Sequence, residues 1–339
     1  MRVALLSGGT GGAKLARGLL DAVGPQNLTV IANTGDDAWV HGAHVSPDPD
    51  LVTYWLADAI DERGYGIRDD SWRVMDALEA AGRPTWFRLG DRDLAMCLIR
   101  SELLAAGERL TDAHAAVVRA MGVEARVLPM SDAPAATTIA AHGRTLPFQE
   151  FMIVERARGP LEGVGLIGAA PGPVGATARD LAGAPRVADP RGSQAAERDR
   201  PEANSAPRPT DAVLAALRDA DAIVVGPSNP IASVAPILTL PGVRAALAET
   251  TAPVVAVSPF VGGAVLKGPT ELFCAFAGIE PSAAGVAAFY GDLIDGIVAD
   301  EPIAAEVPAR ETPTLMDTPA ARHAVAAATL DFAAALVES

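Results

Sequence analysis

The chain alternates short apolar runs with loops built from Gly, Pro, Ser, Asn and Asp, and this alternation limits the folds open to it. Four runs show the pattern, at residues 3–6, 28–32, 222–225 and 253–257. After the first run, apolar residues recur at helical spacing from Leu15 to Val23, which predicts a helix of about a dozen residues. Strands joined through helices form βαβ units, so we predict an α/β fold with a parallel sheet.

Changes in composition divide the chain into parts. We predict that residues 1–182 and 210–310 form a single domain, with a mostly helical insertion near 51–121 and a small β-rich part at 138–167. Residues 183–209 contain no Leu, Ile, Phe, Trp or Tyr, so we predict a flexible low-complexity insertion with little apolar area to bury. The Ala-rich C-terminal third is predicted to be helical and to end in a helical segment at 311–339.

Charge and cysteine content exclude some classes of protein. The chain has 27 Lys and Arg against 42 Asp and Glu, a net charge of −15, which argues against a general contact with nucleic-acid phosphates. Cys97 and Cys274 lie far apart and indicate neither a metal site nor a disulfide framework. No signal peptide and no charge-free run of about 20 apolar residues is evident. We therefore expect a cytoplasmic protein with no membrane partner.

The first loop, Ser7-Gly8-Gly9-Thr10-Gly11-Gly12, is the strongest candidate for a phosphate site. Its backbone N–H groups precede a helix, and helix N-termini attract anions. The dinucleotide fingerprint fails because its third glycine falls on Lys14, and the P-loop fingerprint fails at Ala13 and Leu15. These mismatches argue against a dinucleotide-dependent dehydrogenase and an ordinary P-loop NTPase. The alternative is a tight turn that needs glycine for steric reasons alone.

Four aspartates follow the second apolar run: Asp36, Asp37, Asp48 and Asp50. Carboxylate oxygens are ligands that Mg²⁺ accepts together with phosphate oxygens, and a carboxylate can also orient or deprotonate an attacking hydroxyl. The alternative for Asp50 is structural, because it precedes an apolar helix and could be its N-cap.

Further polar loops follow other predicted elements. Arg88-Leu89-Gly90-Asp91-Arg92-Asp93 could be a solvated cap with a local ion pair or could contact phosphate or carboxylate through its arginines. Met130-Ser131-Asp132 suits hydrogen bonding to the edge of a base or a flavin-like ring. Strand-end loops of an open parallel sheet converge on one crevice, so we expect residues 226–230 and 258–268 beside the first loop.

These motifs, taken together and in order, resemble the 2-phospho-L-lactate transferase family. The resemblance covers about residues 1–300, interrupted by the 183–209 insertion. The matching segments are 7–11, 33–37, 46–50, 89–93, 130–132, 226–230, 258–259 and 267–269. The resemblance implies a Rossmann-like three-layer fold with an inserted helical region, and a homodimer.

The resemblance also implies a reaction in the biosynthesis of coenzyme F-420. A guanosine diphosphate-linked three-carbon acid would donate its phospho-acid moiety to the ribityl hydroxyl of the deazaflavin Fo, releasing GMP. Both substrates are small molecules, and Mg²⁺ is the implied cofactor. Donors that carry 2-phospholactate, phosphoenolpyruvate or 3-phosphoglycerate all fit this sequence.

Resemblance and chemistry together assign the expected site residues to four groups. The catalytic group is Asp50, Asp37 and Asp36. The Fo-binding group is Asp50, Arg88, Asp91, Met130, Ser131 and Asp132. The nucleotide and phosphate group is Gly8, Gly9, Thr10, Gly11, Gly12, Lys14, Gly226, Ser228, Asn229, Ser258 and Lys267. The metal group is Asp36, Asp37 and Asp48.

A second hypothesis is a nucleotide-sugar-binding regulatory protein of the same wider superfamily, without transferase activity. It shares the glycine-rich start and the double aspartate at a strand end. In that group, however, the aspartates lead into a Gly-Gly-Ser-Ser-type phosphate loop. Here Asp37 leads into Ala38-Trp39-Val40-His41-Gly42, which favours the transferase.

Overall fold

A computed structural model describes residues 1–167 and 206–338 of the chain. Its central sheet contains β1 (Val3–Ser7), β2 (Leu28–Ala32), β5 (Arg126–Pro129), β9 (Ala222–Val225), β10 (Val254–Val257), β13 (Gly296–Ala299) and β14 (Ala309–Glu311). The strand order is β14-β13-β10-β9-β1-β2-β5, and every neighbouring pair is parallel. The predicted α/β fold with a parallel sheet is confirmed.

Helices cover both faces of this sheet. On one face lie α1 (Gly9–Val23), α2 (Pro47–Leu56) and α12 (Pro319–Glu338), and on the other lie α7 (Asp211–Arg218), α8 (Ala235–Leu238), α9 (Val243–Glu249) and α11 (Ala283–Tyr290). Strand β1 is buried along its whole length. Val3 and Leu5 pack with the first group of helices, whereas Ala4 and Leu6 pack with the second. Burial on both faces explains the continuous apolar runs in the sequence.

The order of the strands locates a crevice. From β1 the chain adds β2 and β5 on one side, then returns to add β9, β10, β13 and β14 on the other. The direction of winding therefore reverses between β1 and β9. Ligands of open α/β sheets bind outside the carboxyl ends of the strands at such a point, so the loops that follow β1 and β9 flank the expected site.

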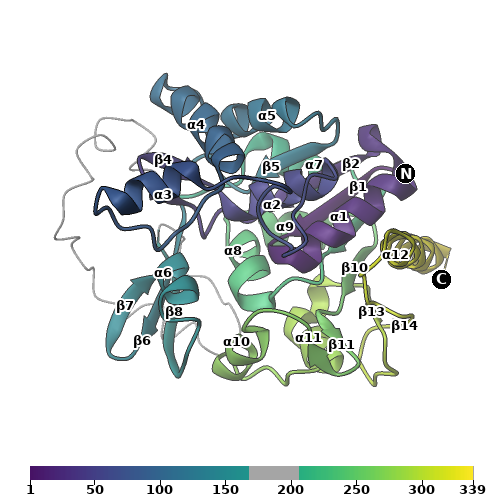
Figure 1. Cartoon of the computed structure of the whole chain (residues 1–339). Helices are drawn as coiled ribbons and strands as arrows, with labels where there is room; N and C mark the ends of the chain where they lie inside the picture. The colour runs from purple at the N-terminus through teal and green to yellow at the C-terminus, as the bar shows by residue number, and fades with distance from the viewer. Residues whose placement is uncertain (168–205, 339) are drawn as a thin grey trace.

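Two insertions surround this core (Figure 1). Between β2 and β5 lie the hairpin β3 (Ala38–Val40) and β4 (Ala43–Val45), α2, and then α3 (Arg73–Ala80), α4 (Asp91–Ala105) and α5 (Leu110–Ala120). After β5, the strands β6 (Ala136–Ala141), β7 (Arg144–Pro147) and β8 (Leu161–Ile167) form a separate small sheet with α6 (Phe148–Ile153). The remaining elements are β11 (Phe260–Val261), β12 (Ala264–Val265) and α10 (Thr270–Phe276). The expected helical insertion and β-rich part are both present.

Two details of the sequence interpretation were wrong, and part of a third lies outside the described residues. The C-terminal third is not all helical, because β13 and β14 extend the sheet there. Asp50 is not the N-cap of its helix, since α2 begins at Pro47 and Ser46 is at its N-cap position. Of the predicted insertion at 183–209, only 206–209 belong to the described residues.

Among the described residues, α12 is the single continuous helix that is long and apolar enough to span a membrane. In this fold it packs against α1 and against β9, β10 and β13. Core helices of globular proteins have the same length and composition. Helix α12 is therefore an integral layer of the domain rather than an appendage.

Candidate functional site

The loops after β1 and β9 are in direct contact. The Gly8 N–H donates to Oγ of Ser228 at 3.2 Å. A side-chain carbon on Gly11 would lie 2.1 Å from the carbonyl oxygen of Pro227, and one on Gly12 would lie 2.7 Å from Oγ of Ser228. Glycine is required at both positions because any side chain would separate the two loops. The structure thus brings together the first loop and residues 226–230, as expected for a shared crevice.

Asp48 joins the first loop to the loop after β2. Its Oδ1 accepts from the Gly9 N–H at 2.6 Å, and its Oδ2 accepts from Nδ2 of Asn33 at 3.0 Å. The side chain is almost completely buried. Burial raises the pKa of Asp48 to about 6, against the opposing effect of these two hydrogen bonds. The carboxylate therefore reaches the start of α1, where a phosphate is expected to bind.

Asp36 is a buried carboxyl group with only one of its oxygens satisfied. Oδ2 accepts from Nε2 of Gln149, which comes from α6, at 3.0 Å. Oδ1 is buried and has no hydrogen-bond partner. Burial raises the pKa of Asp36 well above its ordinary value, and the charges of Asp48 and Asp37 raise it further.

Asp37 lies between the loop after β2 and the start of α2. Its Oδ1 accepts from the Ser46 hydroxyl at 2.7 Å, and its Oδ2 is 3.7 Å from Nε2 of His44. Burial raises the pKa of Asp37 well above its usual range, although the Ser46 hydrogen bond and the charge of Arg100 oppose this shift. Asp36, Asp37 and Asp48 thus form a group of buried carboxyl groups with raised pKa values.

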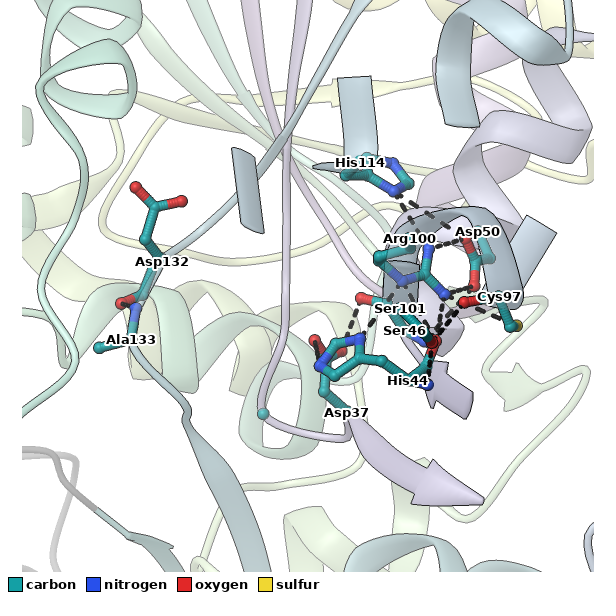
Figure 2. A network of polar contacts seen from close by, with 12 residues as sticks. Asp37, His44, Ser46, Asp50, Cys97, Arg100, Ser101, His114, Asp132 and Ala133 are labelled. Atoms are coloured by element: carbon teal, nitrogen blue, oxygen red, sulfur yellow. Dashed lines mark hydrogen bonds and ion pairs between the residues drawn. The ribbon is translucent and has the colours of Figure 1, made fainter. Parts of the chain in front are cut away.

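Asp50 is in a different environment, shown in Figure 2. Its two oxygens accept from Nη1 and Nη2 of Arg100, each at 2.7 Å. Arg100 comes from α4, is completely buried, and also donates to the carbonyl oxygen of His44 from Nη2 and Nε at 2.9 and 3.2 Å. Burial alone would lower the pKa of Arg100, but Asp50 raises it. The ion pair fixes the orientation of Asp50 and ties α4 to α2.

His114 completes this buried network from α5. Its Nδ1 lies 3.4 Å from Nη1 of Arg100, and its Nε2 lies 3.3 Å from Oγ1 of Thr53. Burial lowers the pKa of His114 to about 4, so the ring is neutral at pH 7. Within this network the Asp50 carboxylate is therefore balanced by the Arg100 guanidinium.

Several residues expected at the Fo site cap helices in this fold. Asp91 accepts from the Ser71 hydroxyl and from the N–H groups of Arg73 and Val74 at the start of α3. Asp132 accepts from the N–H and hydroxyl groups of Thr111 in the first turn of α5. Such contacts satisfy N–H groups that have no partner within a helix.

The other expected Fo residues also have structural partners. Arg88 pairs with two acidic side chains of α3, at 2.9 Å from Asp76 and 3.4 Å from Glu79. Met130 and Ser131 are buried at the end of β5, where Oγ of Ser131 accepts from the Ala133 N–H at 3.1 Å. A role for these residues in binding Fo stays a prediction.

The remaining expected nucleotide residues lie at the strand ends. Oδ1 of Asn229 accepts from two N–H groups in the π-helical turn Pro230–Val234, and Oγ of Ser258 accepts from the Phe260 N–H. These side chains shape their own loops. Lys14 lies in the second turn of α1, and Lys267 lies in the segment after β12.

The aspartates fit a divalent cation in chemistry but are not gathered around a single point. Among the described residues, the group of three with ligand atoms within 4.8 Å of one another is Asp50, Asp93 and Cys97. Asp50 of that group already pairs with Arg100, which opposes a cation. Asp36, Asp37 and Asp48 offer oxygen atoms only, as Mg²⁺ prefers, and the unpartnered Oδ1 of Asp36 lacks a positively charged neighbour. This second group is the better candidate.

Arg100, His114 and Gln149 were not anticipated from the sequence. Arg100 carries a signal in retrospect, because it shares the buried side of α4 with Leu94, Cys97 and Leu104. An arginine at an apolar position of a helix indicates a buried ion pair. Gln149 lies far from Asp36 in sequence, and no local pattern connects them.

Comparisons with known proteins identify the family. Residues 3–329 match the family described as 2-phospho-L-lactate transferase CofD. The chain is 36% identical over 357 residues to a phosphoenolpyruvate transferase of Thermobifida fusca, covering 100% of this chain and 99% of the relative. It is 39% identical over 308 residues to a phosphoenolpyruvate transferase of Kitasatospora aureofaciens, covering 88% and 85%. It is also 36% identical over 298 residues to a 2-phospho-L-lactate transferase of Methanosarcina mazei, covering 88% and 86%.

A solved structure supports the fold independently. Protein BH3568 from Bacillus halodurans superposes with a TM-score of 0.51 at 18% identity, covering 91% of this chain and 88% of that protein. At this identity the likeness concerns the fold alone. The sequence relatives carry the assignment: the chain belongs to the 2-phospho-L-lactate transferase family.

Proposed function

We propose that this chain transfers a 2-phospholactate or phosphoenolpyruvate moiety from its guanosine diphosphate-linked donor to Fo, in the biosynthesis of coenzyme F-420. In this reaction the ribityl hydroxyl of Fo forms a bond to the donor phosphorus that carries the three-carbon acid. The bond from that phosphorus to the GMP oxygen breaks, GMP leaves, and the hydroxyl proton is released. Membership of the family supports the proposal that a 2-phospholactate or phosphoenolpyruvate moiety is the group transferred.

One observation carries the proposal for the site. Asp48 contacts the glycine loop at the point where the sheet reverses direction, Asp36 and Asp37 follow the neighbouring strand β2, and none of the three pairs with a Lys or Arg of the described residues. The one basic side chain within ion-pair distance of them is His44, 3.7 Å from Asp37. A phosphate bound at the start of α1 would therefore lie next to carboxylates that repel it. A divalent cation between them removes this conflict.

Mg²⁺ would be held by oxygens of Asp36, Asp37 and Asp48, and it would supply neutralisation of the diphosphate charge. The chain's own groups do the rest. The N–H groups at the start of α1 and its dipole attract the donor phosphates. Asp50, held by Arg100, orients the Fo hydroxyl through the lone pairs that the ion pair leaves free. Phosphoryl transfer depends mainly on such positioning and charge neutralisation, so no protein nucleophile is needed.

The direct test is product analysis. Purified chain, Fo and Mg²⁺ are incubated with each of three guanylylated donors, carrying phospholactate, phosphoenolpyruvate or 3-phosphoglycerate, and the products are identified by mass spectrometry. We expect GMP and one Fo adduct, and no turnover after chelation of the metal. The absence of an adduct with all three donors contradicts the proposal, and tight binding of a UDP-sugar without any change in Fo fluorescence supports the regulatory alternative.

A variant tests the role of Asp50. Asp50→Asn removes one charge from the ion pair, and we expect turnover with Fo to fall by about 100-fold while GDP binding persists. Asp58→Asn is the matched control, because Asp58 also pairs with an arginine, Arg17, but at an exposed position. Equal turnover in both variants would remove Asp50 from the mechanism.

Light scattering and cell fractionation test the predicted homodimer and the cytoplasmic location.

A further inference from the structure

Arg322 is a buried arginine without an acidic partner. It lies in the first turn of α12 and is 8% exposed. Its Nε is buried and makes no hydrogen bond, and no carboxylate of the described residues lies within ion-pair distance. Its guanidinium lies over the ring of Trp55 in α2, with Cζ of Arg322 5.2 Å from the ring centroid. A buried guanidinium is costly unless a negative charge balances it.

Lys14 places a second positive charge at the same ring. Its Nζ is 5.9 Å from the Trp55 centroid, and it forms no ion pair with any described residue. Burial lowers the pKa of Lys14, and the charge of Arg322 lowers it further, followed in size by the opposing effect of Asp317 and the effect of Lys267. The charges that act on Lys14 are those of Arg322, Asp317 and Lys267, of which two are positive and one is negative. The local charge is therefore positive.

Lys267 adds a third charge from the other side of the first loop. Its Nζ donates to the carbonyl oxygen of Arg63 at 2.8 Å. A side-chain carbon on Gly64 would lie 3.3 Å from this Nζ and 3.8 Å from Cγ2 of Thr10. Lys267 thus lies beside Thr10, one helical turn before Lys14 in α1. These three cations come from three segments far apart in the sequence, and the charges of Arg322 and Lys267 both act on Lys14 of α1.

The kinds of side chain indicate what would balance them. A guanidinium presents a planar fork that matches two phosphate oxygens, and ammonium groups act as additional point charges. The first turns of α1 add the positive end of a helix dipole. A nucleotide base or a neutral sugar would leave the charge on Arg322 unbalanced. A phosphate or diphosphate group carries the negative charge and the oxygen acceptors that these cations lack.

We propose that Lys14, Lys267 and Arg322 form a phosphate-binding site, and that α12 supplies Arg322 to it. The source of the phosphate rests on the proposed function, since the diphosphate of the guanosine-linked donor is the anion expected at α1. The C-terminal helix then has a binding role in addition to packing against α1 (Figure 1).

Binding of pyrophosphate and GDP to the full-length chain tests the site without any transfer reaction. Calorimetry compares wild type with Arg322→Gln and with Arg17→Gln. Arg17 is the matched control, because it lies on α1, carries the same charge and pairs with Asp21 and Asp58. We expect Arg322→Gln to weaken pyrophosphate binding by about tenfold or more and Arg17→Gln to change it less than twofold.

Two further comparisons complete the test. Lys267→Gln changes an exposed residue and should weaken binding in the same direction, which keeps the proposal testable if Arg322→Gln does not fold. Weakened binding of both GDP and pyrophosphate assigns the nucleotide diphosphate as the source, whereas weakened binding of pyrophosphate alone assigns a free phosphate. Unchanged binding in Arg322→Gln or Lys267→Gln overturns the proposal. A chain that binds pyrophosphate through Arg322 but forms no Fo adduct refutes the proposed function and leaves this site standing.

Discussion

Two acidic neighbourhoods, that of Asp50 and that of Asp36, lie within one short segment of this chain, and the charge of the buried carboxyl group is balanced differently in each. Asp50 is buried and has its own guanidinium, because Arg100 contacts both of its oxygens. Asp36 is also buried, yet its Oδ1 has no hydrogen-bond partner and the charges that act on it are those of other carboxyl groups. The first arrangement is complete within the protein. The second becomes complete only when a cation arrives or a proton is taken up.

This difference suits the two neighbourhoods to different roles, the orientation of a substrate hydroxyl at Asp50 and the binding of a metal ion at Asp36. A carboxylate held by a buried arginine fork has a fixed direction, which suits a group that positions a substrate hydroxyl. Carboxyl groups that lack cations have raised pKa values and gain most from a metal ion, because the metal replaces the proton. The predictions below test the two neighbourhoods separately, from the largest expected effect to the smallest.

Removing Arg100 should destabilise the fold strongly. Arg100→Met leaves Asp50 buried without its partner, and we expect the free energy of unfolding to fall by about 4 kcal/mol, measured by urea denaturation. The double variant Asp50→Leu with Arg100→Met should lose less than either single variant, since it leaves no unpaired charge. Arg88→Met is the control, because its ion pairs are exposed and contribute less than about 1 kcal/mol. An equal loss in the two arginine variants would mean that the buried ion pair contributes no more to the free energy of unfolding than the exposed ion pairs do.

Removing Asp36 should do the opposite. Asp36→Asn takes away a buried carboxyl group that has a neutral amide but no cation as its described partner, so the free energy of unfolding should stay constant or rise. The transfer rate should fall by about 100-fold at fixed Mg²⁺, because the variant loses a metal ligand. Parallel urea and steady-state measurements check both results, with Asp21→Asn as a surface control. A stability loss without a rate loss would make Asp36 a purely structural residue.

The pH dependence of stability provides a third test. The pKa of Asp48 is about 6 in the folded chain against an ordinary value of 3.8, so the unfolded chain loses this proton first as pH rises. Folding must then either take up a proton or bury a charged carboxylate, so the contribution of Asp48 to the free energy of unfolding should fall between pH 4 and pH 7 in the absence of metal. The lowered pKa of His114 contributes in the opposite direction over the same range. Asp48→Asn should flatten this fall by about 2 kcal/mol. The same pH dependence in the metal-free wild type and in Asp48→Asn would contradict the raised pKa of Asp48.

Much of the fold could be predicted from the sequence, because the parallel strands are buried on both faces. Continuous runs such as residues 3–6 and 222–225 reveal such strands directly, and the glycine loop follows from its position before a helix. Strand β13 was missed, although all of its residues are buried, because the surrounding alanines favour a helix. An apolar run of four residues was too short to indicate a strand within a segment whose composition favours a helix.

The candidate site could be predicted only in part. Glycines and aspartates at strand ends are visible in the sequence, but their partners are not. Arg100 shares one side of its helix with apolar residues, which indicates burial, but only packing shows that it has an acidic partner while Arg322 has none among the described residues. Conversely, Asp91 and Asp132 look like ligand-binding residues in polar loops, whereas the fold uses them to cap helices. Sequence identifies polar side chains, and tertiary structure decides which of them are already satisfied.

The last and smallest effect concerns such a cap. Asp132→Ala removes the acceptor for the N–H and hydroxyl groups of Thr111, so we expect the free energy of unfolding to fall by about 1 kcal/mol. Asp132→Asn keeps an oxygen in the same place and should recover most of this loss in urea denaturation. The KM for Fo separates the cap from a substrate contact. A tenfold rise in KM with both variants, without loss of stability, would assign Asp132 to the Fo site, whereas an unchanged KM leaves the Asp36–Asp50 segment as the acidic part of the site.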